Sequence, residues 1–173
     1  MDTPLPEQLS FGESLRLEQV FFVSYRRLVV QLYGVIGNRA EAEDVVQEAF
    51  VRAVAAGTRF TETANPEAWL RTTAINLYRS RWRKLRNFSR IKERFAEPHD
   101  IPGLDARLDV IEALRSLPQE QREVVALHHL ADLPVADVAQ ELGLPLGTVK
   151  SRLSRGREAM AQALRADEEV DHV

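Results

Sequence analysis

Residues 133–164, LPVADVAQELGLPLGTVKSRLSRGREAMAQAL, decide how the rest of the chain is interpreted. The first part of this stretch has apolar residues at the i, i+3, i+4, i+7 spacing of one helix face. They are Val135, Val138, Ala139 and Leu142. Gly143 follows, where a tight turn needs a residue that tolerates a positive φ angle. Pro145 suits the first position of a second helix, because its missing N–H would have no partner there.

The second helix of this hairpin has two different kinds of face. Its apolar or small residues recur at steps of four and three and therefore share one face: Val149, Leu153, Gly156, Met160 and Ala163. Its other faces carry basic and hydroxyl side chains: Lys150, Ser151, Arg152, Ser154, Arg155 and Arg157. One packing face and one basic face are typical of a helix that lies in the major groove of DNA.

A solvated amphipathic hairpin is the alternative interpretation of the same residues. Gly156 argues against it, since a glycine inside a helix costs about 1 kcal/mol relative to alanine. This glycine lies on the packing face, where another helix would need to come close. We therefore favour a DNA-binding helix-turn-helix.

Charge is distributed unevenly along the 173 residues. The net charge is −3, but residues 79–94 carry +7 and residues 146–165 carry +4. The remaining residues therefore carry −14. Two basic segments favour contact with nucleic-acid phosphates, and the acidic remainder suits a protein partner.

Composition excludes several other classes of protein. Cysteine is absent, which excludes disulfides and thiolate metal sites and fits a reducing cytoplasm. No apolar run reaches the roughly 18 residues of a membrane span, and the start of the chain lacks the basic region of a signal peptide. We expect a cytoplasmic protein with no membrane insertion, no metal and no cofactor.

The first half of the chain is expected to be helical. Residues 1–12 are expected to form an arm, and a helix is expected over residues 13–34. Asn38, followed by Glu41 three residues later, resembles a capping box at the start of a helix over residues 39–55. That helix is expected to bury one set of residues: Val45, Val46, Ala49, Phe50, Ala53 and Val54.

A polar loop around Phe60 is expected over residues 56–65, and Asn65 with Pro66 marks the start of the next helix. That helix is expected to reach at least residue 87, with Leu70, Ala74, Leu77, Arg81 and Leu85 along its buried side. Another of its faces is polar and basic, with Asn76, Arg79, Arg83, Arg86 and Arg90. Four aromatic residues are interleaved with this basic run: Trp69, Tyr78, Trp82 and Phe88. Proteins that bind single-stranded nucleic acid combine these two kinds of side chain, although core packing is an alternative role for the tryptophans.

Residues 96–103, with two prolines and a glycine, are expected to be a flexible linker. One helix then follows, and Ser116 is expected to cap the next, which begins near Pro118. The adjacent His128 and His129 point in different directions on a helix and do not suit a shared metal. The fold class predicted is all-α, with two small helical domains at residues 13–95 and 104–166.

Four segments of the chain together resemble the bacterial sigma-70 family, and specifically its small two-domain extracytoplasmic-function (ECF) group. They are AEAEDVVQEAFVRAV (40–54), NPEAWLRTTAINLYRSRWRK (65–84), SLPQEQREVVALHHL (116–130) and VADVAQELGLPLGTVKSRLSRGREAM (135–160). The resemblance implies a first domain like sigma region 2, which docks on the polymerase clamp helices and melts the −10 element. It implies a second domain like region 4, which reads the −35 element and touches the polymerase flap.

The resemblance also implies roles for individual residues. Polymerase docking falls on Asp44, Gln47 and Glu48. Capture of a flipped base and of the −10 strand falls on Phe60, Thr61, Asn65, Asn76, Arg79 and Arg83. Reading of the −35 element falls on Thr148, Lys150, Ser151, Ser154 and Arg155. A cognate anti-sigma factor is a further expected partner.

Three places depart from the family pattern, and two other functions remain as alternatives. At one of them, residues 133–135 replace a more polar helix entry. Ser80 stands where relatives usually carry an acid, and Ser154 is small where some relatives carry a larger side chain. One alternative is a stand-alone helix-turn-helix regulator of duplex operators, which would leave the basic helix from residue 66 without a role. The other is an enzyme, but HExxH, P-loop and GxSxG motifs are all absent, so we expect no catalytic residues.

Overall fold

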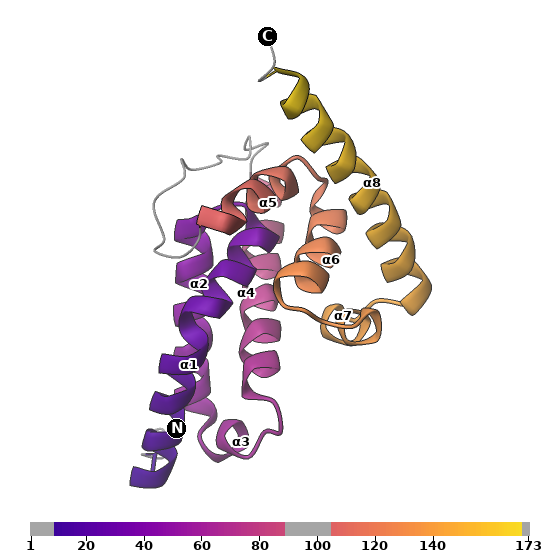
Figure 1. The fold of residues 1–173 in the computed structure, drawn as a ribbon. Helices are drawn as coiled ribbons and strands as arrows, with labels where there is room; N and C mark the ends of the chain where they lie inside the picture. Colours follow the sequence, from indigo (N-terminus) through magenta and orange to yellow (C-terminus); the bar gives the residue numbers. More distant parts are fainter. Residues whose placement is uncertain (1–8, 89–104, 171–173) are drawn as a thin grey trace. The chain divides into compact units, whose positions relative to one another are not determined.

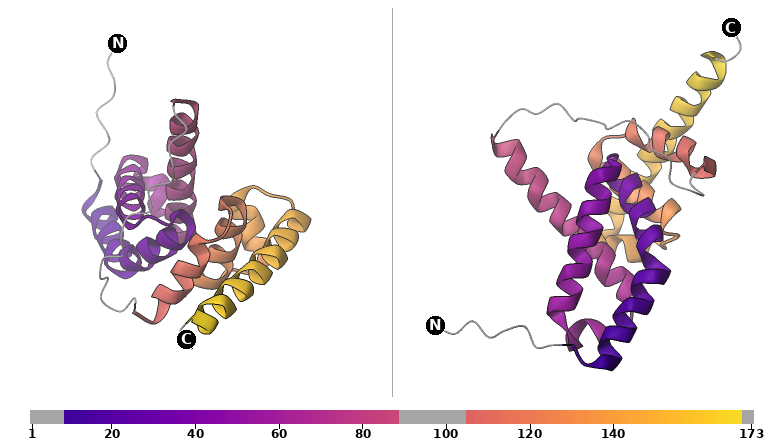
Figure 2. Two further views of the ribbon diagram at one scale, coloured as in Figure 1. Left: turned by 90° about the horizontal axis from the view of Figure 1, so that it is seen from above. Right: turned by 90° about the vertical axis from the view of Figure 1, so that its left-hand side faces the viewer.

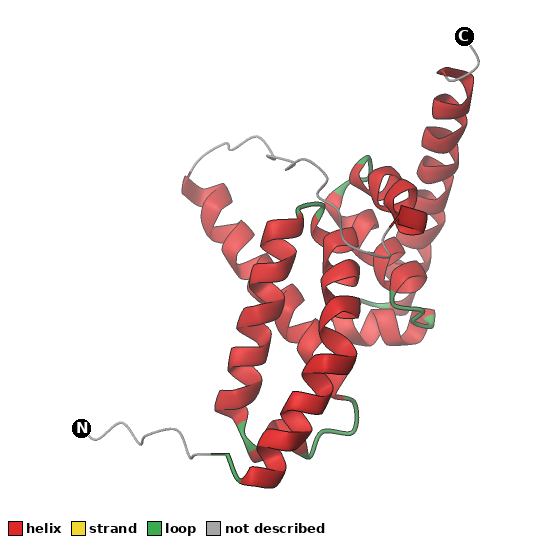
Figure 3. Cartoon of the chain, turned by 60° about the vertical axis from the view of Figure 1, so that its left-hand side comes forward, coloured by secondary structure: helices red, strands yellow, loops and turns green. Residues whose placement is uncertain are grey.

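Helices make up both halves of the chain in the computed structural model, which describes residues 9–88 and 105–170 (Figure 1). The described residues form eight helices and no strand, which confirms the all-α prediction (Figure 3). Contacts divide the chain into two compact units, residues 1–32 with 40–94 and residues 33–39 with 95–173. The predicted linker at 96–103 lies outside the described residues. None of the helices described is long and apolar enough to cross a bilayer.

The first unit contains most of α1 (Phe11–Ile36), whose residues 33–36 belong to the second unit, together with α2 (Arg39–Ala56), α3 (Thr58–Thr61) and α4 (Pro66–Phe88). Two views in Figure 2 show α1, α2 and α4 packed along one another. The apolar side chains that these three helices bury include Leu28, Leu32, Val45, Val46, Ala49, Leu70, Ala74 and Ile75. Two expected core residues are exposed instead, since Val54 is 47% and Leu85 is 55% accessible. Spacing along a helix shows which residues share a face, but it does not show which of them another helix covers.

The start of α1 differs from the prediction of an arm over residues 1–12. The backbone N–H of Ser10 donates to Glu13 Oε2 at 2.8 Å, and the N–H of Glu13 donates to Ser10 Oγ at 3.3 Å. This reciprocal pair is a capping box, which satisfies two of the unpaired donors at a helix start. The helix therefore begins at Phe11, two residues earlier than expected.

The connection between α2 and α4 is also more ordered than the polar loop expected over 56–65. It contains the single turn α3, which Gly57 introduces with a φ of 53°. Asn65 then caps α4, because its Oδ1 accepts the N–H of Ala68 at 3.0 Å. This confirms Asn65 and Pro66 as the start of that helix.

The second unit contains α5 (Asp105–Arg115), α6 (Gln119–Leu130), α7 (Val135–Leu142) and α8 (Leu146–Val170). A proline immediately precedes each of the last three helices: Pro118, Pro134 and Pro145. Each proline carbonyl accepts the N–H four residues on, at 2.9 to 3.2 Å, so the proline starts the helix without needing a donor of its own. The expected cap at Ser116 is wrong, because its hydroxyl donates back to Ala113 O at 2.7 Å. Pro145 likewise lies one residue before α8 and not inside it.

Two glycines shape the helix-turn-helix as the sequence predicts. Gly143 has φ 63° and ψ 36° at the end of α7. The N–H of Leu144 donates to Ala139 O at 2.9 Å and the N–H of Gly143 donates to Gln140 O at 3.3 Å, which is the Schellman pattern. Gly156 is buried, and a Cβ atom added to it would lie 2.5 Å from Val125 Cγ2 on α6. The predicted close approach of another helix is therefore confirmed.

Gly156→Ala should destabilise the second unit, because the added methyl group overlaps Val125 and α6 or α8 must shift. Overpacking of this kind costs about 1–3 kcal/mol. Chemical denaturation followed by circular dichroism measures the loss.

Gly147→Ala is the matched control, since this glycine also lies in α8 but nothing surrounds its Cβ position within 4 Å. Its free energy of unfolding should be unchanged or raised by up to about 1 kcal/mol. An equal loss in both variants would contradict the close-contact explanation.

Candidate nucleic-acid interface

The second helix of the helix-turn-helix, α8, has one buried face and one exposed face. Val149 is 0% and Leu153 is 4% accessible, and both lie on the side of Gly156. Four of the residues predicted to read DNA are exposed: Lys150, Ser151, Ser154 and Arg155. The fifth, Thr148, is half-buried in the first turn of α8. The structure therefore brings all five to the first three turns of one helix, around a side that faces solvent.

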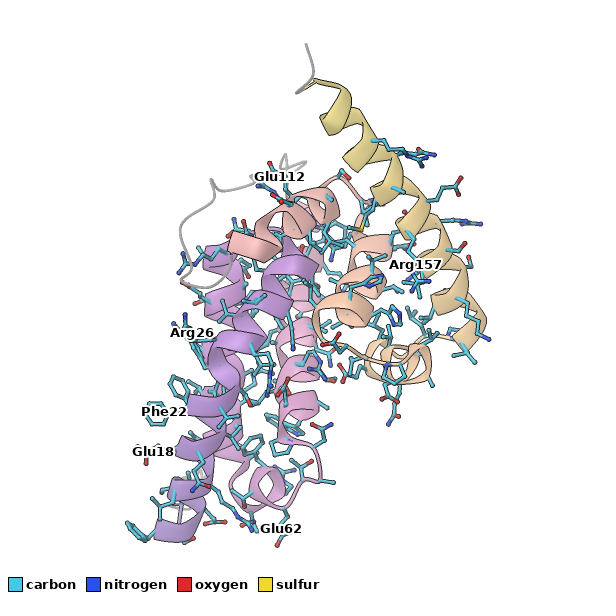
Figure 4. The ribbon with its side chains drawn as sticks, in the orientation of Figure 1. Glu18, Phe22, Arg26, Glu62, Glu112 and Arg157 are labelled. Atoms are coloured by element: carbon cyan, nitrogen blue, oxygen red, sulfur yellow. The ribbon has the colours of Figure 1, made fainter. Side chains whose placement is uncertain are left out.

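Two other basic side chains of α8 are engaged by α6. Arg152 pairs with Glu120 at 3.0 Å, and Arg157 Nε donates to His129 Nε2 at 3.4 Å; Figure 4 labels Arg157 on this helix. Burial, His128 and Arg157 all lower the pKa of His129, which favours the neutral ring that accepts this hydrogen bond. Arg152 and Arg157 thus differ from Lys150 and Arg155, because the first two contact side chains of α6. The composition of the helix does not show this difference.

An open groove of about 410 Å³ lies between the first turns of α8 and the start of α6. Its walls are Pro118, Glu120, Gln121, Gly147, Thr148, Ser151, Arg152 and Arg155. Three of the predicted DNA-reading residues line it. The start of α6 therefore borders the same surface, which the sequence pattern did not indicate.

A second polar surface runs along α4 in the first unit. Trp69, Thr72, Asn76, Arg79 and Arg83 recur at steps of three and four, so they form one continuous stripe. Asn76 and Arg83 are exposed, and the other three are half-buried. Arg83 Nε lies 3.4 Å from the carbonyl oxygen of Arg79, which directs its side chain along the helix. The three α4 residues predicted to hold a strand therefore share this stripe.

The loop that precedes α4 requires a correction at Phe60. This side chain is only 1% accessible, and its ring packs edge-on against Trp69 with centroids 5.1 Å apart. Phe60 is therefore a core residue under the loop and presents no surface to a ligand, because the short helix α3 turns it inward. Thr61 is half-buried and Asn65 is exposed, with its carbonyl oxygen fixed by the helix cap.

The predicted docking residues on α2 all have intramolecular partners. Asp44 forms an ion pair with Arg81 of α4, which also pairs with Glu41 at 3.1 Å. The hydrogen bond that Arg81 donates to Asp44 raises the pKa of Arg81. Gln47 Nε2 donates to the hydroxyl of Tyr25 on α1 at 3.2 Å, and Glu48 pairs with Arg52 one turn later. These side chains remain partly exposed, so their internal contacts orient them without covering them.

A polar cluster between α1 and α4 was missed by the sequence analysis. Glu67 receives hydrogen bonds from Ser24 at 3.4 Å and Gln31 at 3.4 Å, and it pairs with Arg27. Arg71, which is 3% accessible, donates to Gln31 Oε1 at 3.0 Å and to Glu67 Oε1 at 3.4 Å. The available signal was Ser24 and Gln31 on an otherwise apolar helix face, since buried polar residues need partners.

Family models match both units in order. The model for sigma-70 region 2 matches residues 21–88, and the model for sigma-70 region 4 matches residues 107–160. The ECF RNA polymerase sigma factor SigW of Bacillus subtilis is 32% identical over 159 residues, which cover 82% of this chain and 85% of SigW. The chain belongs to the sigma-70 family, in its ECF group.

Other ECF sigma factors agree with this assignment. EcfG of Rhodopseudomonas palustris is 37% identical over 136 residues, which cover 76% of this sigma factor and 75% of EcfG. Among solved structures, the sigma factor RpoE of Bartonella quintana in complex with the anti-sigma factor NepR has a TM-score of 0.70 at 28% identity. That match covers 87% of this chain and 97% of RpoE. CnrH, solved with the cytosolic domain of CnrY, has a TM-score of 0.61 at 25% identity and covers 90% of this chain and 92% of CnrH.

The family assignment gives the two surfaces their context. The protein is an RNA polymerase sigma factor, and its family acts in transcription initiation. The α4 stripe lies within the region 2 match, and the exposed side of α8 lies within the region 4 match. The polar cluster around Glu67 also lies within the region 2 match, and it includes Glu67 and Arg71 from the first turns of α4.

Glu67→Ala should destabilise the first unit, because it removes the carboxylate beside the buried guanidinium of Arg71. Loss of one partner from a buried charge pair costs several kcal/mol, and the partial exposure of Glu67 reduces this to about 1–3 kcal/mol. The midpoint of urea unfolding measures the change.

Glu62→Ala is the control, since Glu62 is an exposed acid just after α3 (Figure 4). Its removal should change the free energy of unfolding by no more than about 0.5 kcal/mol. If the two variants unfold at the same urea concentration, the cluster does not stabilise the fold.

Proposed function

We propose that this sigma factor reads two promoter elements with two separate surfaces, the exposed side of α8 and the stripe on α4. The observation that carries the proposal is the division of α8 into a face that packs on α6 and a face that leaves Lys150 and Arg155 exposed. A recognition helix needs both faces, one to fix its position and one to reach base edges.

The −35 element is assigned to α8. Arg155 and Lys150 are the best candidates for guanine, because Arg and Lys pair with its O6 and N7 in the major groove. Thr148 and Ser151 are assigned to phosphate oxygens, which set the register of the helix on the duplex. Ser154 precedes Arg155 in α8, is exposed, and is assigned to the base edges that it can reach.

The −10 element is assigned to α4 and the loop before it. Extruding a base costs a few kcal/mol of unstacking, so an open strand needs a surface that binds it. Asn76 is assigned to the flipped base and Arg79 and Arg83 to the strand backbone. Thr61 and Asn65 border the same strand, and the half-buried Trp69 offers a ring for stacking. Phe60 supports this loop from below and makes no direct contact.

Binding to core polymerase is assigned to Asp44, Gln47 and Glu48 on α2, against the clamp helices, with the second unit on the flap. Asp44 is held by Arg81 and Gln47 by Tyr25, so both enter the interface in fixed orientations. Fixed side chains lose less conformational freedom on binding. The chemistry of RNA synthesis belongs to the core enzyme, and no catalytic residue is assigned to this chain.

A cognate anti-sigma factor is proposed as a third partner. One of the similar solved structures is a sigma factor bound to the anti-sigma factor NepR, and another is CnrH bound to the cytosolic domain of CnrY. We place the protein in the cytoplasm, where these partners and RNA polymerase are available.

The function is tested by selection from promoters with randomised sequence, using core polymerase with and without this chain. The proposal expects two separated elements to be enriched only in the presence of the chain. Enrichment of one continuous operator, or of nothing, would contradict it.

Arg155→Ala should reduce discrimination at one base pair of the −35 element by about 1–3 kcal/mol, because a bidentate contact to guanine is lost. Binding of holoenzyme to the selected promoter and to its single-base variants measures this change. Arg165→Ala removes the same charge from the distal part of α8 and should leave base discrimination unaltered. Equal weakening of all sequences by Arg155→Ala would identify a phosphate contact instead.

A further inference from the structure

The first turns of α1 and Leu9, just before this helix, contact the loop that precedes α4 at three points. Leu9 Cδ2 lies 3.8 Å from the Cβ position of Gly57. Thr58 Oγ1 donates to Glu13 Oε1 at 3.0 Å, and Arg16 Nη1 donates to the carbonyl oxygen of Thr61 at 3.2 Å. The contacts are spaced along the whole of α3, whose place beside the start of α1 is visible in Figures 1 and 2.

Glu13 links this contact to the start of its own helix. One carboxylate oxygen accepts the N–H of Ser10, and the other accepts the hydroxyl of Thr58. Hydrogen bonds from the backbone and side chain of Ser10 and from Thr58 lower the pKa of Glu13, so the side chain is a carboxylate at neutral pH. The same group therefore caps α1 and holds α3.

Arg16 acts on the loop backbone. A hydrogen bond to a main-chain carbonyl holds the backbone in place whichever side chain the residue carries. Arg16 donates such a bond to the carbonyl oxygen of Thr61, where α3 ends. Thr61 Oγ1 in turn donates to Thr58 O at 3.2 Å, which closes the turn between the two held residues.

We propose that Glu13 and Arg16 are positioning residues that hold the 57–65 loop in the shape that receives the −10 strand. This inference rests on the proposed role of that loop. The loop is polar and short, and apart from the buried Phe60 its described side chains are exposed or half-buried. Its own core contacts are therefore few, and the first turns of α1 supply further contacts through Glu13 and Arg16.

The test uses the full chain with core polymerase and the promoter recovered by selection, with each base pair of its −10 and −35 elements changed in turn. Glu13→Ala and Arg16→Ala should each reduce −10 discrimination by about threefold to tenfold, as small misplacements of a binding group do. Discrimination at −35 and affinity for core polymerase should change by less than about twofold, since those surfaces are untouched.

Thr58 provides the pair of variants that separates positioning from general destabilisation. Thr58→Ser keeps the hydroxyl that donates to Glu13 and should keep −10 discrimination, whereas Thr58→Val keeps the shape, loses the donor and should reduce it. If Glu13 acts through Thr58, the double variant Glu13→Ala with Thr58→Val should lose no more than either single variant. Glu18→Ala is the charge control, because Glu18 is exposed on α1 and projects outward in Figure 4.

Asn76→Ala distinguishes failure of this inference from failure of the proposed site. Loss of −10 discrimination with Asn76→Ala but not with Glu13→Ala or Thr58→Val would overturn the positioning role alone. No loss with any of the three would overturn both. Equal loss at −10 and −35 in the Glu13 and Arg16 variants would show that these residues support the whole fold and not the loop.

Discussion

The close approach of α8 to α6 at Gly156 is the contact on which the DNA-binding surface depends. With no side chain at this position, the backbone of α8 comes close enough for a methyl group to overlap Val125. Val149 and Leu153 are buried on the same side, so rotation of α8 about its axis would expose apolar surface. The exposed side of the helix, with Lys150 and Arg155, follows from this constraint. The proposed contacts to base edges therefore depend on how the opposite side of α8 packs.

Charged residues in this protein divide into those that hold the fold and those that face solvent. Arg71, Arg81, Arg152 and Arg157 each contact a residue of another helix or of their own. Lys150, Arg155 and Arg83 are exposed on the two proposed nucleic-acid surfaces. The positive charge available to phosphates is therefore smaller than the basic segments of the sequence suggest. What matters for binding is which arginines retain access to solvent.

Local rules predicted the features that depend on a few neighbouring residues. Gly143 adopts the positive φ that its turn requires, and Asn65 caps α4, because both are decided within one turn of chain. The capping box of Ser10 and Glu13 carries the same kind of local signal and was available in the sequence. Ser116 shows the limit of such rules. Its hydroxyl donates to the carbonyl oxygen of Ala113, earlier in the chain, and Pro118 precedes the helix instead.

Features that depend on distant residues were beyond the sequence. Phe60 looks like an exposed aromatic in a polar loop, but the turn of α3 places it against Trp69. The partners of Glu67 on α1 lie some forty residues away in the chain, so spacing gave no indication of them. The resemblance gave the correct family, yet it could not show that Asp44 pairs with Arg81 or that the start of α6 borders the proposed −35 surface.

We propose that this chain anchors on duplex DNA through α8 and opens the duplex through the surface of α4. Permanganate oxidation of unpaired thymines, in complexes of core polymerase, this chain and a selected promoter, tests it most directly. Reactive thymines should be confined to the −10 element. Asn76→Ala should abolish this reactivity while the −35 element stays protected from nuclease. Reactivity that is absent in the unaltered protein, or unchanged in Asn76→Ala, would contradict it.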